Sequence, residues 1–91
     1  MEDEEKGRLV FARDLKELWK DKKGSFHRLH GPAITHPNGD MSWYIHGQRH
    51  RDDGPAIYWP ERKIEVWYKD GKKYQPSAHE LMVWKMKKKE G

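Results

Sequence analysis

The sequence predicts a mainly β protein: an antiparallel β-meander of about three hairpin repeats, with a period of about 24 residues, closed by a C-terminal α-helix. Three observations predict this class. An eight-residue motif occurs twice, short β-forming runs alternate with turn residues, and the last 15 residues begin with a helix cap and contain no Pro and no Gly before Gly91.

The repeated motif reads HRLHGPAI from His27 and HRDDGPAI from His50, with the two starts 23 residues apart. A Trp follows each copy, and Trp43 and Trp67 are 24 residues apart. Trp19 takes the same place in a fainter first copy. Because self-similarity at such a period is typical of stacked repeats, we expect the three Trp side chains to form one buried ladder.

Each repeat is expected to be a hairpin. In the second copy, residues 33–36 and 41–45 are rich in β-forming residues and flank the turn Pro37-Asn38-Gly39-Asp40, in which Asn-Gly is a strong hairpin signal. In the third copy the expected strands are residues 56–59 and 64–69, with a longer turn that lacks Gly. The first copy turns near residues 13–15. Its stretch FARDLKELW also fits a helical turn, but the repeat register favours a strand.

The chain is expected to divide into an acidic disordered segment (1–6), a repeat domain (7–76, with repeats of about 7–30, 31–53 and 54–76) and a C-terminal helix with a basic tail (77–91). Ser77 and Glu80 have the spacing of a capping box, so we expect a helix from Ala78 to about Lys89. Its apolar residues are expected to pack on the sheet or its open end: Leu81, Met82, Val83 or Trp84, and Met86.

The composition restricts the class of protein. The chain lacks Cys, which excludes disulfides and thiol chemistry, and its formal net charge of +4 permits an acidic partner without requiring one. No apolar run approaches the length of a membrane span, and the acidic start MEDEEKGR does not fit a secretory signal. We therefore expect a cytoplasmic protein that does not enter a membrane.

The units HRxxGPAI, PNGD and WYxxG resemble MORN-like (MORN-variant) repeats, which are common in bacterial proteins, tailed bacteriophages and large DNA viruses. The resemblance covers about residues 7–74 and is specific over residues 27–71. It implies an extended antiparallel sheet of two-stranded units. It also implies association with proteins or membrane surfaces rather than catalysis, and a viral origin would make the host cytoplasm the location and a host enzyme or defence complex the target.

Several polar motifs invite a chemical interpretation, but the repeat explains them as structural. His27 and His50 hold the same repeat position, and the spacings to His30 and His46 would suit a metal only on a helix. Each Arg after these His residues is expected to stack on Trp or to bond a turn carbonyl. Asp52-Asp53 fits a turn. In Gly-Pro, Gly is expected to supply an unusual backbone angle and Pro to start the strand.

One helix cannot cover both faces of a sheet, so some aromatic residues outside the Trp ladder are expected to be exposed. Exposed Tyr, Trp and Arg are enriched at protein interfaces. We therefore predict a non-enzymatic protein-binding module without cofactor or metal, whose contact residues are Tyr44, Arg51, Tyr58, Trp59 and Tyr68.

Two alternatives stay open. The first is a nucleic-acid-binding protein that contacts phosphates through basic residues: Arg28, Arg51, Lys72, Lys73, Lys87, Lys88 and Lys89. The second is a structural subunit of a larger assembly that self-associates through the edge formed by residues 7–19. No nucleophile–base pair or cofactor loop points to an enzyme.

Overall fold

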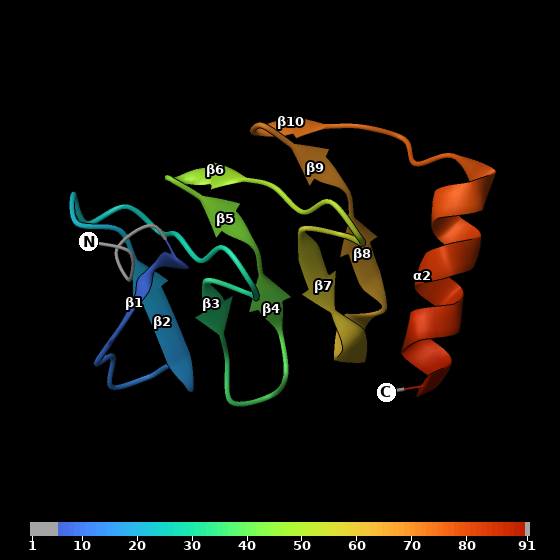
Figure 1. Ribbon diagram of the computed structural model, residues 1–91. Coiled ribbons are helices and arrows are strands. Elements are labelled where there is room, and N and C mark those ends of the chain that lie inside the picture. The colour runs from blue at the N-terminus through green and yellow to red at the C-terminus, as the bar shows by residue number, and fades with distance from the viewer. Residues whose placement is uncertain (1–5, 91) are drawn as a thin grey trace.

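The computed structural model describes residues 6–90, with side chains described as far as Lys88. The predicted acidic segment therefore lies, except for Lys6, outside the described residues. The described chain is mainly β, with ten short strands and one long C-terminal helix, α2 (Ala78–Glu90). Figure 1 shows the repeats side by side, with α2 at the end of the row. The predicted fold class is confirmed.

Six strands form one antiparallel sheet in the order β1-β2-β3-β4-β7-β8. They are β1 (Arg8–Val10), β2 (Glu17–Lys20), β3 (Ile34–Thr35), β4 (Met41–Ser42), β7 (Ile57–Trp59) and β8 (Ile64–Val66). Each strand pairs with its predecessor in this order, as in a meander. The first copy thus forms a strand pair and not a helix.

Beyond this sheet, each repeat carries a second, smaller hairpin. β5 (Tyr44–Ile45) pairs with β6 (Gln48–Arg49), and β9 (Tyr68–Lys69) pairs with β10 (Lys72–Lys73). The first repeat has a single bridge between Lys20 and Phe26 at the same place. We call residues 20–26, 44–50 and 68–74 together the hairpin row. It runs along one edge of the molecule in Figure 1.

The expectation of unbroken strands over residues 41–45 and 64–69 is wrong, because each strand is interrupted at its Trp. The N–H of Trp43 donates to Ala56 O in the next repeat (2.7 Å), whereas Trp43 O accepts from His50 N–H in its own repeat (3.2 Å). Trp67 O likewise accepts from Tyr74 N–H at 3.0 Å. The chain changes pairing partner at these Trp residues, so one long strand becomes two short ones.

The hairpin turns follow the predicted turn chemistry. Gly39 has φ of +97°, and the N–H of Asp40 donates to Asn38 Oδ1 at 3.0 Å. The longer turn in the third repeat is a 3₁₀ turn, η1 (Pro60–Arg62), and Lys63 supplies the left-handed residue with φ of +57°. Lys63 thus takes the place of a turn Gly, which is an uncommon role for a residue with a side chain.

The three Trp residues do not form a continuous buried ladder, because an Arg lies over each of the first two. The Arg28 guanidinium lies 4.0 Å from the centre of the Trp19 ring, and that of Arg51 lies 3.7 Å from the centre of Trp43. Trp19 and Trp43 are half-buried, and Trp67 is buried. The expected stacking of Arg on Trp is therefore confirmed, but the expected ladder of three buried Trp rings is wrong.

The Gly of each Gly-Pro pair is explained by its size and not by its backbone angle, which corrects the expectation. Neither Gly31 nor Gly54 has a positive φ. A Cβ atom on Gly31 would lie 2.8 Å from Arg28 Cζ, and one on Gly54 would lie 2.9 Å from Arg51 Cζ. Glycine therefore leaves room for the Arg side chain, which packs directly on its backbone.

The recurring His residues join neighbouring repeats. The N–H of His46 donates to His27 Nδ1 at 2.9 Å, and the N–H of Asp70 donates to His50 Nδ1 at 3.0 Å. His46 and Asp70 both have positive φ, so each His accepts from the left-handed turn residue of the following hairpin. These bonds confirm a structural role for His27 and His50.

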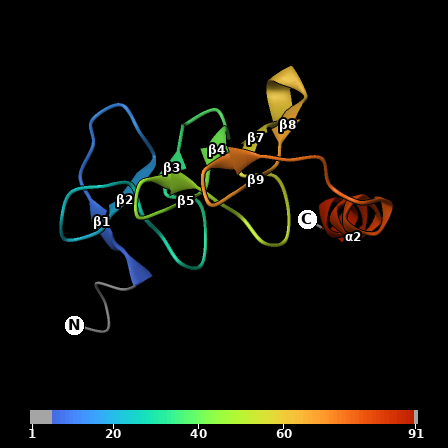
Figure 2. The same cartoon turned by 90° about the horizontal axis from the view of Figure 1, so that it is seen from above.

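Helix α2 closes the end of the meander beside β8 (Figures 1 and 2). Its predicted capping box is formed: the N–H of Ser77 donates to Glu80 Oε1 (2.8 Å), and the N–H of Glu80 donates to Ser77 Oγ (3.1 Å). Trp84 is buried with its ring edge-on to Tyr58. The expectation that Met82 and Met86 pack on the sheet is wrong, since both are more than half exposed; one face of a helix at the end of a single sheet faces solvent.

We predict that Gly54→Ala lowers the free energy of unfolding by about 1–3 kcal/mol, because the added Cβ overpacks a filled site. That Cβ would lie 3.0 Å from the Trp84 ring as well as against Arg51, whereas the only close atoms for Gly31→Ala belong to the Arg28 side chain. Urea unfolding of both variants should therefore show the larger loss for Gly54→Ala. Equal losses would contradict this assignment of the two glycines.

Candidate functional site

The five predicted protein-binding residues do not form one surface. Tyr44 and Tyr68 lie on the hairpin row, whereas the ring of Tyr58 packs against Trp84 of α2. Trp59 lies at the third turn, where its ring contacts Arg62 at 5.5 Å. The fifth residue, Arg51, lies over the ring of Trp43.

Arg28 and Arg51 are occupied by internal contacts, although both were also considered as phosphate ligands. Arg51 is only 12% exposed at its side chain and bonds Asp53 at 3.0 Å; Arg28 is 24% exposed and bonds Glu17 at 3.2 Å. Burial lowers the pKa of Arg51, and the bond to Asp53 opposes that effect. Both Arg side chains also donate to the carbonyl of the following Gly-Pro unit. Their contacts account for their recurrence in the sequence.

The remaining residues of the predicted nucleic-acid set are also dispersed. In α2, Lys87 bonds Asp53 and Lys88 bonds Glu65, each at 2.7 Å. Lys72 and Lys73 lie on β10 at the far end of the third hairpin. The side chain of Lys89 lies outside those described. The structure thus places Lys72 and Lys73 on the hairpin row, apart from the other members.

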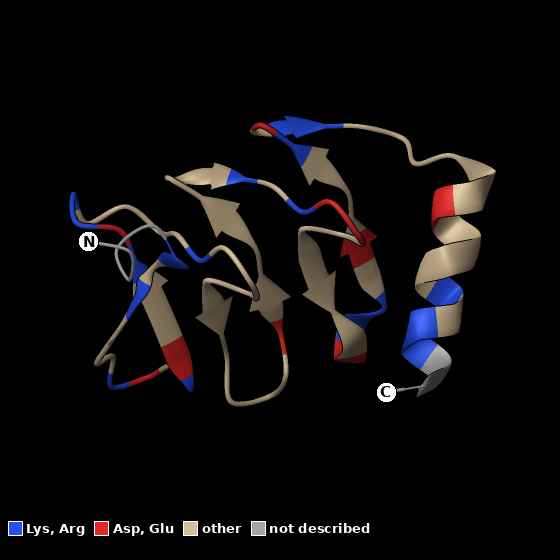
Figure 3. Ribbon diagram, in the orientation of Figure 1, with Lys and Arg blue, Asp and Glu red and all other residues tan. Residues whose placement is uncertain are grey.

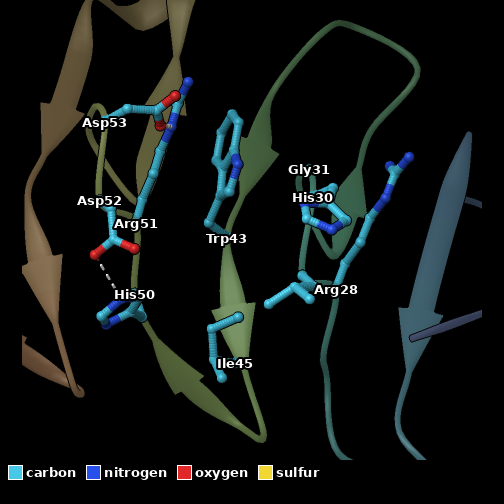
Figure 4. A pocket seen from close by; sticks show the side chains of 10 residues that line it. Arg28, His30, Gly31, Trp43, Ile45, His50, Arg51, Asp52 and Asp53 are labelled. Atoms are coloured by element: carbon cyan, nitrogen blue, oxygen red, sulfur yellow. Dashed lines mark hydrogen bonds and ion pairs between the residues drawn. The ribbon is translucent and has the colours of Figure 1, made fainter. Parts of the chain in front are cut away.

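A groove of about 640 Å³ lies between the two HRxxG loops, with Trp43 and Ile45 between them (Figure 4). Its walls are residues 28–31 and 50–53. Several polar groups in these walls have internal partners, among them His50, whose Nε2 lies 2.9 Å from Asp52 Oδ1. Among residues 6–88, no group of three His, Asp or Glu side chains is arranged to hold a metal ion. We therefore interpret the groove residues as structural, because they form contacts within and between the two repeats.

A different cluster has the character of a contact site. Arg49 lies between two tyrosines of neighbouring repeats: its Nε donates to Tyr44 Oη (3.4 Å) and its Nη1 donates to Tyr68 Oη (3.3 Å). Its guanidinium also lies over both rings, 6.0 Å from the centre of Tyr44 and 5.2 Å from that of Tyr68. We name Tyr44, Arg49 and Tyr68 the Tyr–Arg–Tyr cluster.

The cluster belongs to a pattern that runs through all three repeats. Cross-strand partners in the hairpin row are Lys20 with Phe26, Tyr44 with Arg49, and Tyr68 with Lys73. Directly paired residues of an antiparallel pair point to the same face. Each repeat therefore presents one aromatic and one basic side chain on one face, and the rings of Phe26 and Tyr44 touch with centres 5.3 Å apart.

The sequence prediction missed Arg49, Phe26 and Lys20. The signal lies at two positions of the repeat. One is the residue after each Trp, and the other is the residue before His27, His50 and Tyr74, which hold the same repeat position. Neither position keeps one residue type in all three repeats. The first repeat has the basic residue after its Trp and the aromatic residue before its His, and the other two repeats have the reverse order. Only the two positions taken together show the pattern.

Positive charge is concentrated on this row. Its three segments contain seven Lys or Arg and two Asp, whereas the rest of the chain has 12 Lys or Arg and 13 Asp or Glu. Figure 3 shows the basic residues on β6, β9 and β10. Among residues 6–88, Arg49 makes no ion pair with a carboxylate, and the hydrogen bond to Tyr44 raises its pKa. The row therefore carries positive charge that the described chain does not neutralise.

Of the two acidic residues in the row, Asp21 is buried. Its Oδ1 accepts from the N–H groups of Lys23 and Ser25, each at 2.9 Å, and its Oδ2 lies 2.8 Å from His46 Nδ1. The bond to His46, helped by the two backbone donors, lowers the pKa of Asp21 to about 2. Asp21 thus fixes the first turn and joins it to the second hairpin, rather than offering a surface charge.

Comparison of the chain with protein-family models, curated proteins and solved structures finds no match. The resemblance to MORN-like repeats therefore stays a prediction. No helix among the described residues is both long enough and apolar enough to cross a membrane.

We predict that Asp21→Asn removes a pH-dependent part of the stability. Because the folded pKa is about 2 and the unfolded value is near 4, the carboxylate stabilises the fold above about pH 4. This stabilisation is lost as the pH falls from about 4 through 2. Urea unfolding across this range should show the wild type approaching the variant. The matched control is Asp14→Asn, at an exposed turn position; an Asp21→Asn curve parallel to the wild type at every pH would refute the role of Asp21.

Proposed function

We propose that this protein is a small non-enzymatic protein-binding module whose contact surface is the hairpin row and whose partner presents an acidic segment. The observation that carries the proposal is the Tyr–Arg–Tyr cluster. Arg49 is exposed, is held by two tyrosine hydroxyls, and has no carboxylate partner among the described side chains. An acidic partner would supply the missing counter-charge.

The residue types support a protein interface. Tyr and Arg are the residues over-represented among those that contribute most to binding energy at interfaces. Tyr44 and Tyr68 are half-buried, so their rings are held by neighbours before a partner arrives. Binding to a surface that is already ordered loses less side-chain entropy than binding to a mobile one.

The rigidity of the row has a visible origin in the bonds between repeats. The N–H of Gly47 donates to Phe26 O at 2.8 Å, and the N–H of Gly71 donates to Arg49 O at 2.9 Å. Each hairpin is thus hydrogen-bonded to the preceding one by its turn. These bonds and the His contacts described above keep the aromatic and basic side chains in register along the row.

Nucleic acid is the second candidate, because the charge excess of the row would attract phosphates. Base stacking needs an open aromatic face, however, and here Arg49 lies over both Tyr rings while Phe26 packs against Tyr44. This arrangement favours the protein partner. That the partner is a host enzyme or defence complex blocked by a viral protein is supported by the family resemblance alone.

We predict that a photo-reactive residue at position 48, exposed on β6 next to Arg49, cross-links a protein partner in nuclease-treated extract. Arg49→Ala should lower the yield at least about tenfold, as loss of a charged hydrogen-bonding group at an interface does. Yield is measured by mass spectrometry of the cross-linked species.

The matched control for this experiment is Arg62→Ala, which removes one positive charge and one Arg–Trp contact at the third turn, away from the row. It should leave the yield unchanged. Equal losses in both variants, or cross-links that disappear only on nuclease treatment, would reject the hairpin row as a protein-binding surface.

A further inference from the structure

We infer that the Tyr–Arg–Tyr cluster is an anion site that takes the phosphate of a phosphorylated side chain on the partner. This inference rests on the proposed function and names the group that the row recognises. It is carried by the geometry of three side chains from two neighbouring repeats: Tyr44 and Arg49 from the second hairpin, and Tyr68 from the third.

The cluster holds several hydrogen-bond donors that its own contacts do not use. Each Tyr Oη already accepts an N–H from Arg49, so its own O–H proton is left to donate elsewhere. Arg49 uses one N–H of Nε and one of Nη1 in these bonds, which leaves three N–H groups, one on Nη1 and two on Nη2. Two hydroxyls and the remaining guanidinium N–H groups, joined through these bonds, are therefore available to an oxyanion with several acceptor oxygens.

The charge of the surroundings favours a phosphate over a single carboxylate. Lys73 is the cross-strand partner of Tyr68, and Lys20 is paired with Phe26 on the other side. A phosphorylated side chain carries a charge of about −1.5 to −2 at neutral pH and three acceptor oxygens, whereas Glu carries one negative charge. A phosphate therefore suits this number of donors and this excess of cations better than a single carboxylate does.

The cluster is a single site rather than a track. Arg28 and Arg51, which recur with the repeats and could have extended a phosphate path, lie in the Trp stack with Glu17 and Asp53 as partners. A polynucleotide presents a phosphate at every nucleotide and gains from open aromatic faces, which the row lacks. One phosphorylated side chain in an acidic peptide needs only the one site.

The test is a titration of the full chain with three pentapeptides that differ at the central residue: phosphoserine, serine and glutamate. Binding is followed by NMR shifts of the Arg49 Nε–H and the backbone amides of β5, β6 and β9. We expect the phosphoserine peptide to bind at least about tenfold more tightly than the glutamate peptide. Arg49→Ala should reduce its affinity at least about tenfold, and Tyr44→Phe or Tyr68→Phe about threefold to tenfold, because each removes one donor to a charged group.

The Tyr→Phe variants keep the rings, so loss of folding does not confuse the result, and thermal unfolding checks each protein. Arg62→Ala is the charge-matched control and should bind as the wild type does. Equal affinity for the glutamate peptide, an equal loss in Arg62→Ala, or insensitivity to Tyr44→Phe and Tyr68→Phe would overturn the inference. So would tighter binding of a single-stranded oligonucleotide or of vesicles that contain phosphorylated lipid headgroups.

The two proposals fail in different ways. If cross-linking at position 48 captures a protein, and this capture survives phosphatase treatment of the extract, the hairpin row binds proteins but the phosphate site is wrong. If the phosphoserine peptide binds and no protein cross-links, the anion site stands while the protein-binding function fails.

Discussion

The contact between an Arg guanidinium, the Trp ring before it and the Gly after it is the interaction on which the rest of this structure depends. It occurs as Trp19–Arg28–Gly31 and again as Trp43–Arg51–Gly54. A chain with 37% charged residues cannot bury a thick aliphatic core, and few hydrophobic side chains are fully buried among the described residues. The stacked Arg side chains provide packing and hydrogen bonds together, and a side chain at either Gly would force the guanidinium to shift.

The same contact accounts for the position of the candidate site. Trp43 changes its pairing partner, so the chain after it is free to form β5 and β6 outside the main sheet. The residue after each Trp then begins a hairpin of the row. Tyr44 and Tyr68 hold this position in the second and third repeats, and they lie on either side of Arg49. The residues of the repeated motif are structural, and the residues beside them differ between repeats but are presented at a fixed spacing. Binding specificity can therefore change through these neighbouring residues without altering the scaffold.

Much of the fold could be predicted from local signals. The Asn38-Gly39 turn, the Ser77–Glu80 cap and the strands of the first copy each depend on nearby residues and the repeat period. The break at Trp43 depends on a bond to Ala56 in the next repeat, and the need for Gly31 depends on where the Arg28 side chain lies. Arg49 was missed for the same reason, since its two Tyr partners belong to different repeats and the motif letters do not show their contact.

The most direct test of the central contact is a double-mutant cycle between Trp43→Leu and Arg51→Met, measured by urea unfolding. Because the guanidinium lies 3.7 Å from the ring centre and is largely buried, we predict a coupling energy of about 1–2 kcal/mol between the two side chains. A coupling energy within about 0.3 kcal/mol of zero would show that the two residues stabilise the fold independently. That result would contradict the account in which the fold depends on the Trp–Arg contact.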